Sequence, residues 1–476
     1  MTLEGFLLQG AQPGYEQNLV GIARRWVTLL GPAGVAGLIG NEFTKRVADL
    51  LESPGLDDPT RLTLATDMGM LSWWRSPAPS MEDRKRYDAT ARLSLERITA
   101  GFEIPTRPLP KSKLRRAHVL FAGMLMSKMH SPSGGAIDYA AALTLDPQVQ
   151  RLDIIHNGEI LPDMAEYIKE RLGGKISRSI IKFISTDKNP HFLTDIIEQG
   201  PCTFHNWCES KYSIYTNVAN KIGPMLTFTC GDEPPIQYAD VFWYFYTKEH
   251  MEERWRLRGA PNSYIANYVR SASGPCLDGP PPEKVDRASI GLKPDAFVIT
   301  TVGNRLAVEM DEAFLMGMVQ QIKATPKCVW LVVGALTESL TLLLSTQLGS
   351  QFIHIQYENQ LARLMTTVDL FANPFRSGGG NSVNLAIGAG AVTLTCAKGD
   401  VSTLVPPEFL SQSPDEYFIQ LKALIDSPAM LAEWKSKQFA HNRIMRDQRA
   451  FLAALQQMID LAGKRYNERF AVGVAA

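Results

Sequence analysis

Residues 368–395, VDLFANPFRSGGGNSVNLAIGAGAVTLT, form the stretch that most constrains the fold of this chain. An apolar run that ends at Ala372 is too short for a helix, and a proline and three consecutive glycines follow it. This pattern predicts a buried strand that ends in a glycine turn. Asn381 and Ser382 stand where the N-cap of a helix is expected, and Gly390 ends that helix before a second apolar run. The stretch therefore predicts strand, turn, helix and strand, the repeating unit of α/β folds.

The glycine turn also predicts an anion site. Glycines allow a ligand to approach the main chain, and the N–H groups and dipole at a helix N-terminus favour a negative charge. The alternative is a turn that only connects two elements, which is the commoner role of such turns. A phosphate group is the ligand that this turn would suit, and the surrounding residues decide between the two interpretations.

Composition excludes several classes of function. The chain has 476 residues, 49 Lys and Arg against 49 Asp and Glu, and a formal net charge of zero. Net charge therefore gives no reason to expect binding to nucleic acid or to an anionic membrane. The N-terminus lacks the basic segment and apolar core of a signal peptide, and no apolar run reaches the ~18 residues of a membrane span. We expect a cytoplasmic globular protein of roughly two to four domains.

The six cysteines predict neither a disulfide framework nor a metal centre. A cytoplasm keeps thiols reduced, and a chain of this length does not need disulfides to fold. Cys202, His205 and Cys208 in CTFHNWC are the only cluster that resembles metal ligands, and no second pair lies at zinc-site spacing. We expect buried thiols here and no metal.

Three regions follow one another along the chain. Residues 1–112 show helical periodicity at 15–30, 41–51 and 80–98 and no strand pattern, so they predict an all-helical N-terminal domain. This region ends in PTRPLPKSKLRR, a basic linker whose prolines stop a helix.

Residues 113–275 predict a first Rossmann-like domain. The run 117–125, a turn, a helix from about residue 137 and the run 152–156 form a βαβ unit. Short apolar runs continue the sheet, at 180–184, 225–229 and 241–246. The segment 274–283, GPCLDGPPPE, breaks regular structure and predicts a domain boundary.

Residues 276–476 predict a second Rossmann-like domain, on the donor side, with C-terminal helices over 414–469. Strands at 297–302, 329–334 and 352–356 alternate with helices before the glycine stretch. The predicted fold class is α/β of the GT-B type: two doubly wound Rossmann-like domains preceded by an all-helical N-terminal domain.

Ligands of such sheets bind at the carboxyl ends of the strands. In the second domain, these ends are residues 303–305, which offer the Arg305 cation, and residues 373–381, which offer the helix N-terminus. In the first domain, His130 lies in the loop after the first strand, where an imidazole could orient an acceptor, take its proton or contact a phosphate. The alternative for His130 is ordinary polar surface. His156 ends a strand and could line the same cleft, whereas His441 is expected to be structural.

Two motifs resemble a known family. NPFRSGGGNSVNLAIGAG, residues 373–390, resembles the donor-sugar motif of the bacterial cytoplasmic N-glucosyltransferases that modify high-molecular-weight adhesins, and more distantly the paired-glycine motif of the O-GlcNAc transferases. NRLAVEMDEAFL, residues 304–315, is similar to the segment that carries a phosphate-binding cation in that family, which would be Arg305 here. The family also has a helical domain ahead of its two sheet domains. Together the motifs cover about thirty residues.

The resemblance and the loop positions give a set of candidate site residues. The catalytic candidates are His130 and Arg305. The donor-binding candidates are Asn373, Phe375, Gly379, Gly380, Asn381, Ser382 and Asn384, and the acceptor-side loop contains Ser131, Gly134 and Gly135. One position departs from the family, because Leu385 stands where the family has an acid that holds the nucleotide ribose, with Asn384 beside it.

The resemblance implies a glycosyltransferase that moves a hexose, glucose by analogy, from a UDP-sugar to a protein side chain. Transfer places negative charge on the departing diphosphate, so Arg305 and the amides near 379–382 would stabilise it without a metal or another cofactor. Two alternatives remain open: a saccharide or lipid acceptor, and a non-catalytic binding protein with a degenerate donor site. Leu385 is the feature that favours the second alternative.

Overall fold

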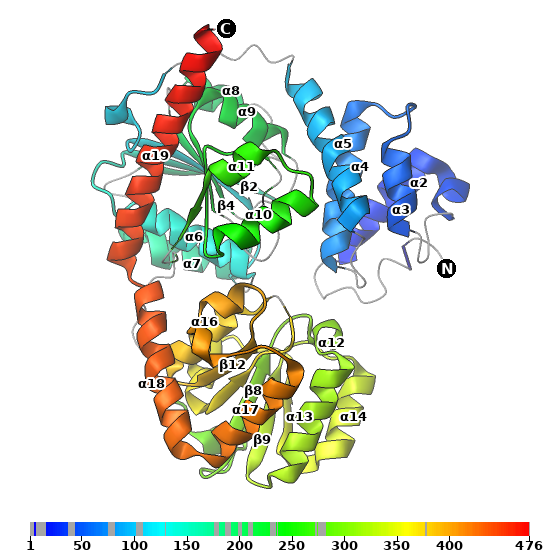
Figure 1. Cartoon of the computed structure of the whole chain (residues 1–476), viewed down its shortest axis with the longest axis vertical. Coiled ribbons are helices and arrows are strands. Elements are labelled where there is room, and N and C mark those ends of the chain that lie inside the picture. The colour runs from blue at the N-terminus through cyan, green and yellow to red at the C-terminus, as the bar shows by residue number, and fades with distance from the viewer. Residues whose placement is uncertain are drawn as a thin grey trace. The chain divides into compact units, whose positions relative to one another are not determined.

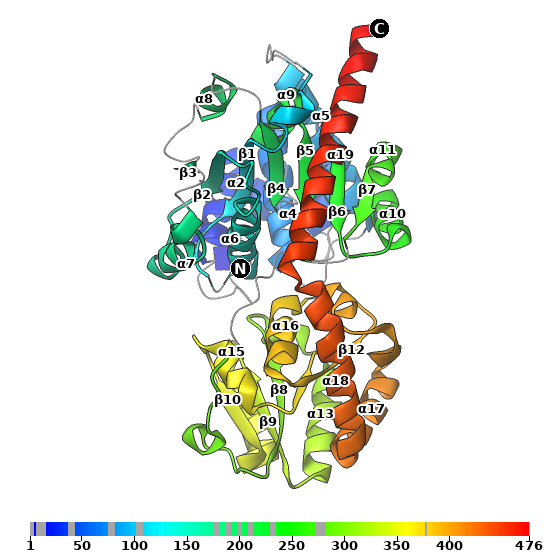
Figure 2. The same cartoon turned by 90° about the vertical axis from the view of Figure 1, so that its left-hand side faces the viewer.

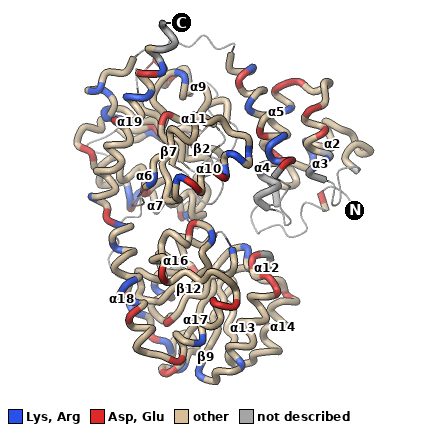
Figure 3. Tube along the Cα trace, in the orientation of Figure 1, with Lys and Arg blue, Asp and Glu red and all other residues tan. Residues whose placement is uncertain are grey.

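The computed structural model describes residues 4–5, 16–36, 43–74, 81–100, 108–128, 130–175, 180–185, 192–198, 202–207, 213–228, 235, 237–271, 274, 282–376 and 378–475 (Figure 1). The chain forms two compact units, residues 1–276 with 448–476 and residues 277–447. Lys and Arg residues are interspersed with Asp and Glu along the trace (Figure 3), as the zero net charge predicts. Among the described helices, none is both long and apolar enough to cross a membrane.

The longer helices described at the start of the first unit are α2 (Glu16–Ala36), α3 (Phe43–Leu51), α4 (Asp58–Trp74) and α5 (Met81–Ala100). Their apolar faces share a core that includes the fully buried Trp26 and Tyr87. A buried ion pair ties these helices to the sheet region, because Arg258 donates to both oxygens of Asp88, at 2.5 and 2.8 Å. This pair accounts in part for the grouping of the helical region with the first sheet in one unit.

The first sheet has seven strands that pair in parallel, in the order β3-β2-β1-β4-β5-β6-β7. The strands are β1 (Ala117–Met124), β2 (Arg151–Asn157), β3 (Ile180–Ser185), β4 (Thr203–Trp207), β5 (Met225–Phe228), β6 (Val241–Tyr244) and β7 (Tyr268–Arg270). The helices are α6 (Ser131–Leu143), α7 (Pro162–Leu172), α8 (Phe192–Glu198), α9 (Ile214–Ile222), α10 (Lys248–Leu257), α11 (Asn262–Ala266) and α19 (Gln448–Ala475).

The second unit contains a six-stranded parallel sheet with the order β10-β9-β8-β11-β12-β13. Its strands are β8 (Phe297–Val302), β9 (Cys328–Val333), β10 (Phe352–Ile355), β11 (Leu370–Ala372), β12 (Val392–Cys396) and β13 (Leu410–Ser411). Its helices are α12 (Leu306–Glu309), α13 (Glu312–Ala324), α14 (Glu338–Leu348), α15 (Leu361–Leu364), α16 (Gly380–Ala389), α17 (Pro414–Asp426) and α18 (Pro428–Met445).

Both sheets therefore have the doubly wound order, in which the chain moves outward in one direction and then returns to the middle to continue in the other. Most of their helices follow strands of the same sheet, as the alternating pattern of the sequence predicts, and α19 is an exception because it follows α18. The predicted fold class is confirmed, with two Rossmann-like sheets preceded by helices.

The compact units divide the chain differently from the three predicted regions, because α19 belongs to the first unit. This helix packs against α6, β5 and β6 (Figure 2). The ring of Phe451 stacks on Trp243 of β6 at 5.1 Å, and Asp460 pairs with Arg115 at 2.6 Å. The sequence analysis placed residues 448–476 with the donor side because they follow it along the chain, but the partners of their apolar face lie in the first sheet.

Candidate functional site

The switch point of the second sheet brings the two predicted loops together. Strand order reverses between β8 and β11, which are neighbours in the sheet. Parallel strands end at the same edge, so the loop after β8 and the glycine turn after β11 start side by side. Ligands of doubly wound sheets bind at such a switch point.

Arg376 joins these two loops. Its side chain is 6% exposed, and it donates from Nη2 to the carbonyl oxygen of Val302 at 2.6 Å and from Nε to Oδ1 of Asn373 at 3.0 Å. Its Nη1 pairs with Oε2 of Glu309 at 2.5 Å. A buried guanidinium needs several acceptors, and these three groups come from the end of β8, the end of β11 and α12.

Glu309 extends this network to Arg305. The other carboxylate oxygen of Glu309, Oε1, pairs with Nη2 of Arg305 at 2.6 Å. The Arg305 side chain is 28% exposed, against 12% for Glu309. Arg305 precedes α12, and the backbone N–H of Glu309 donates to the carbonyl of Arg305 at 2.9 Å, so both side chains lie one helical turn apart. Of the two arginines that pair with Glu309, Arg305 at 28% exposure is therefore more accessible than Arg376 at 6%.

Two glycines make room for the Arg376 guanidinium. A Cβ on Gly303 would lie 2.3 Å from Nη1 of Arg376, and a Cβ on Gly379 would lie 2.7 Å from Nη2. Gly379 also has a φ of 111°, a conformation that side chains other than glycine rarely adopt. These two glycines therefore allow the Arg376 side chain to pack here, in addition to any space that they leave for a ligand.

Helix α16 starts at Gly380, two residues earlier than an N-cap at Asn381 predicts. Gly379 is its N-cap, so Asn381 and Ser382 lie inside the first turn and do not cap it. Since glycine has no side chain, no N-cap side chain occupies the first-turn amides of residues 380–382. These amides are the donors that an anion at this helix end would use.

The carboxyl group of Asp400 lies near the N-terminus of α16. Oδ2 of Asp400, in the turn after β12, would be 2.8 Å from a Cβ on Gly380. Burial raises the pKa of Asp400 to about 6, and the nearby charge of Arg376 opposes that rise. Asp400 therefore adds a titratable group to the glycine turn that the sequence analysis did not consider.

The other donor-binding candidates have mainly structural contacts. Asn373 is fully buried and accepts from Arg376. Phe375 makes edge-to-face contacts with Phe314 and Tyr417, with ring centroids 5.5 and 5.3 Å apart. Asn384 accepts a 2.6 Å hydrogen bond from Asn442 of α18, and Leu385 packs against the apolar core.

In the first unit, His130 follows β1, which is the switch-point strand of that sheet. His130 is the N-cap residue of α6, and its Nδ1 lies 2.7 Å from Oγ of the fully buried Ser133. Gly135 has a packing role, because a Cβ there would lie 2.6 Å from the ring of Trp207 on β4. Gly134 and the exposed Ser131 lie in the first turn of α6.

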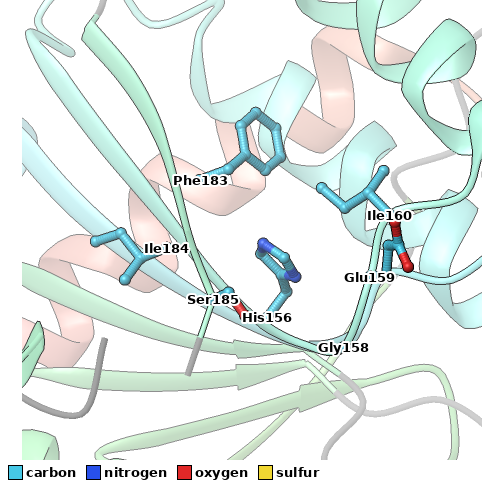
Figure 4. Close-up of a pocket in the computed structure, with 7 residues that line it drawn as sticks. All are labelled: His156, Gly158, Glu159, Ile160, Phe183, Ile184 and Ser185. Atoms are coloured by element: carbon cyan, nitrogen blue, oxygen red, sulfur yellow. The ribbon is translucent and has the colours of Figure 1, made fainter. Parts of the chain in front are cut away.

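His156 is the next-to-last residue of β2 and lines a pocket of about 440 Å³ at the carboxyl ends of β2 and β3. Figure 4 shows its ring between Phe183 and the segment that contains Glu159 and Ile160. The wall of this pocket contains polar as well as apolar side chains, since Ser185 also lines it. The same histidine lines a second pocket, of about 400 Å³, together with residues of α2 and α4.

The suspected metal cluster is only partly described, since Cys208 lies outside the described residues. His205 contacts another histidine and a tyrosine: its Nε2 lies 2.9 Å from His118 Nδ1, and its Nδ1 lies 2.9 Å from the Tyr139 hydroxyl. Burial raises the pKa of the Cys202 thiol to about 12. Within the described ranges, no group of three or more His, Cys, Asp or Glu residues is arranged to hold a metal ion.

Sequence reasoning missed Glu309, Arg376 and Ser133, although all three lie in or beside motifs that it quoted. Glu309 lies four residues after Arg305, which is the spacing of a helical ion pair and was the available signal. Arg376 is a charged residue in an otherwise apolar and small-residue turn. Two of its three partners, Val302 and Glu309, are distant in sequence, so the spacing alone gives no signal for its role.

Comparisons with known proteins place this architecture. No protein-family model matches the chain. No curated protein matches it by sequence. Among solved structures, a mutant of the Thermobaculum terrenum O-GlcNAc transferase aligns over 97% of both chains with a TM-score of 0.57 and 13% identity.

The chain has the GT-B fold.

Two further structures are less similar to this GT-B chain. The pneumococcal O-GlcNAc transferase GtfA, in complex with UDP and GlcNAc, has a TM-score of 0.42 and 11% identity over 58% of this chain and 60% of its own. The lipopolysaccharide outer core galactosyltransferase WaaB has a TM-score of 0.48 and 12% identity over 71% of this chain and 99% of its own.

Proposed function

We propose that this GT-B protein is a metal-independent glycosyltransferase that uses a UDP-sugar donor. The observation that supports the proposal most directly is the meeting of Arg305 with the glycine turn and the α16 N-terminus at one switch point, through Glu309 and Arg376. A guanidinium and backbone amides are the groups that recognise a diphosphate. The fold shared with an O-GlcNAc transferase favours the same class of reaction.

The chemistry follows from the charges that develop during transfer. As the bond between the sugar and the diphosphate breaks, positive charge grows on the sugar and negative charge on the leaving oxygen. Arg305 and the amides of residues 380–382 would stabilise that leaving group, which is the role that a divalent cation has in metal-dependent enzymes. Neither a metal nor another cofactor is part of the proposed reaction.

The finer assignments rest on the motif resemblance alone. They are glucose as the sugar, a protein side chain as the acceptor and membership of the adhesin N-glucosyltransferase group. The proposed cytoplasmic location rests instead on the N-terminal sequence and on the lengths of the apolar runs. His130, held by Ser133 at the end of β1, would orient or deprotonate the acceptor. A saccharide or lipid acceptor would use the same donor site, so the donor is the part to test first.

A non-catalytic binding protein is the second candidate, favoured by Leu385, whose side chain packs against the core where the family has a ribose-binding acid. Thermal-shift titration of the full chain with UDP and UDP-sugars separates the two candidates. An enzyme should be stabilised by UDP and should hydrolyse a UDP-sugar slowly. Stabilisation by UDP without hydrolysis of any UDP-sugar would favour the binding protein, and absence of any stabilisation would contradict both.

The Arg305→Ala variant tests the proposed cation. Loss of one group that stabilises a leaving group typically costs ~3 kcal/mol of barrier, so UDP-sugar hydrolysis should fall by two to three orders of magnitude. Because Arg305 is partly exposed and its pair with Glu309 is local, the unfolding temperature should stay close to that of the wild type. Arg443→Ala, at an exposed position on α18, is the matched control. Wild-type hydrolysis by Arg305→Ala would remove Arg305 from the site.

A further inference from the structure

We propose that Glu309 is a positioning residue of the donor site, which orients Arg305 by bridging it to the buried Arg376. The inference rests on the proposed function, since it concerns the cation of the same site. It assigns roles to two side chains that the motif resemblance leaves without one.

Arg376 is the fixed end of the bridge. Each of its three side-chain nitrogens is engaged, with Asn373, Val302 and Glu309 as acceptors. The side chain is 6% exposed, and Asn373 is fully buried. A guanidinium held in this way cannot turn toward a ligand without giving up buried hydrogen bonds, which would cost several kcal/mol. Arg376 therefore supplies a rigid anchor to the protein.

Glu309 links Arg305 to this fixed guanidinium and so restricts the orientation of the Arg305 side chain. One carboxylate oxygen pairs with Arg376 at 2.5 Å and the other pairs with Arg305 at 2.6 Å, so the carboxylate has one arginine on each side. Without this negative charge, two guanidinium groups would repel each other across a short distance. The three groups together carry a formal charge of +1, and Arg305 is the more exposed of the two cations.

The Arg305 guanidinium carries more N–H donors than its pair with Glu309 uses. Its pair with Glu309 engages Nη2, whereas a guanidinium carries five N–H groups in a planar fork. One edge can therefore hold Glu309 while other N–H groups serve a phosphate oxygen. Holding the fork in advance reduces the entropy that ligand binding would otherwise cost, so loss of Glu309 should weaken nucleotide binding through Arg305.

A double-mutant cycle tests this chain of contacts, with UDP as the probe and isothermal titration calorimetry on the full chain as the measurement. We expect Glu309→Gln to weaken UDP binding about tenfold, and to change it less than twofold when Arg305 is already alanine. Glu433→Gln removes an exposed ion pair of the same spacing on α18, with Lys437, and should leave UDP affinity unchanged.

The outcomes separate this inference from the proposed function. If the wild type binds UDP and Glu309→Gln binds it equally well, or loses the same affinity with and without Arg305, Glu309 does not position Arg305 and only this inference fails. If the wild type does not bind UDP, the proposed function fails and the inference fails with it. Should Glu309→Gln not fold, Glu309→Asp replaces it in the same cycle: the shorter side chain cannot span both arginines, so an intermediate loss is expected and wild-type affinity would overturn the inference.

Discussion

At the scale of single residues, Asp400 shows how the glycine turn holds charges that the sequence pattern does not reveal. Its carboxyl group lies against Gly380, and burial raises its pKa to about 6 from a usual value near 3.8. A carboxyl group with a raised pKa binds its proton more tightly in the native state than in the unfolded state. The ionised form is therefore the costly one in the fold, and the cost appears as the pH rises from about 4 to about 6.

The Asp400→Asn variant should remove this cost. At pH 7.5 the variant should exceed the wild type in free energy of unfolding by about 1–3 kcal/mol, since one unit of pKa corresponds to ~1.4 kcal/mol. At pH 4, where the native Asp400 is protonated, the difference should vanish. Urea unfolding at the two pH values measures both quantities, with Asp295→Asn at an exposed position as the control. A variant that is less stable than the wild type at pH 7.5 would show that Asp400 is held by stabilising contacts.

The position of Arg305 in the loop after β8 could be predicted from the sequence, because it closely follows a clear strand run and belongs to a motif. Arg376 could not be assigned a role in the same way. Its significance comes from the pairing of β8 with β11, which brings Val302 and Glu309 to a residue that lies about 70 positions later. Such a contact depends on the order of strands in the sheet, and the local pattern does not encode that order.

At the scale of elements, the turn before α16 contains two adjacent glycines with different surroundings. A Cβ on Gly379 would lie 2.7 Å from Arg376 and 2.8 Å from Asn373 Oδ1, and its φ is 111°. A Cβ on Gly378 would meet nothing within 4 Å, and its φ lies outside the range that favours glycine. The two positions therefore form a matched pair for substitution.

We expect Gly379→Ala to lower the free energy of unfolding by about 1–3 kcal/mol, because it adds backbone strain and displaces a buried side chain. Gly378→Ala should be neutral or should stabilise the fold by up to ~1 kcal/mol, since it only restricts the unfolded chain. Chemical denaturation of both variants without ligand tests the pair. Equal stabilities would show that the turn adjusts freely and that Arg376 is not confined by it.

The elements that the sequence predicted best are the long apolar strands, since their pattern is local. The first strand, predicted at 117–125, is Ala117–Met124, and the run 297–302 is β8. The sequence analysis missed β4 because its centre is polar: His205 and Asn206 are buried in the middle of the sheet. The burial of His205 is possible because long-range hydrogen bonds with His118 and Tyr139 satisfy both nitrogens of its ring.

At the scale of the whole molecule, the two units contain different acid-sensitive groups. In the first unit, a buried chain of hydrogen bonds joins α6, β4 and β1. The carbonyl of Arg115 can only accept, so Nε2 of His118 donates to it, and His118 Nδ1 must accept from Nε2 of His205. The Tyr139 hydroxyl then donates to His205 Nδ1. Each ring is neutral in this arrangement, and a proton added to either histidine would break one hydrogen bond.

Acid should therefore destabilise the first unit through these histidines. Burial lowers the pKa of His118 to about 4 and lowers that of His205 well below its usual value. The hydrogen bond to the Arg115 carbonyl and the charge of Asp146 oppose the fall in the pKa of His118, and the charge of Arg115 adds to it. Because the unfolded chain binds these protons near pH 6.5, stability is lost as the pH falls from about 6.5 toward 4, by ~1.4 kcal/mol per pH unit for each histidine. Asp240, whose pKa is raised to about 6, titrates in the opposite sense in the same unit, so mutation must isolate the histidine contribution.

His118→Gln should make the unfolding transition of the first unit less sensitive to acid between pH 7 and 5, even though the variant is less stable at neutral pH. Differential scanning calorimetry at several pH values gives the slope of the transition temperature, which separates titration from simple loss of packing. His441→Gln is the control, since His441 lies in the second unit and bonds only the Thr403 carbonyl among the contacts identified for it. Because Asp400 makes the second unit gain stability over part of the same range, the two transitions should respond to acid in opposite directions. In the wild type, the two transition temperatures should not shift together with pH, and the slope for the first unit should change in His118→Gln. If both temperatures shift in parallel and His118→Gln keeps the wild-type slope, the assignment of these groups to independent units is wrong.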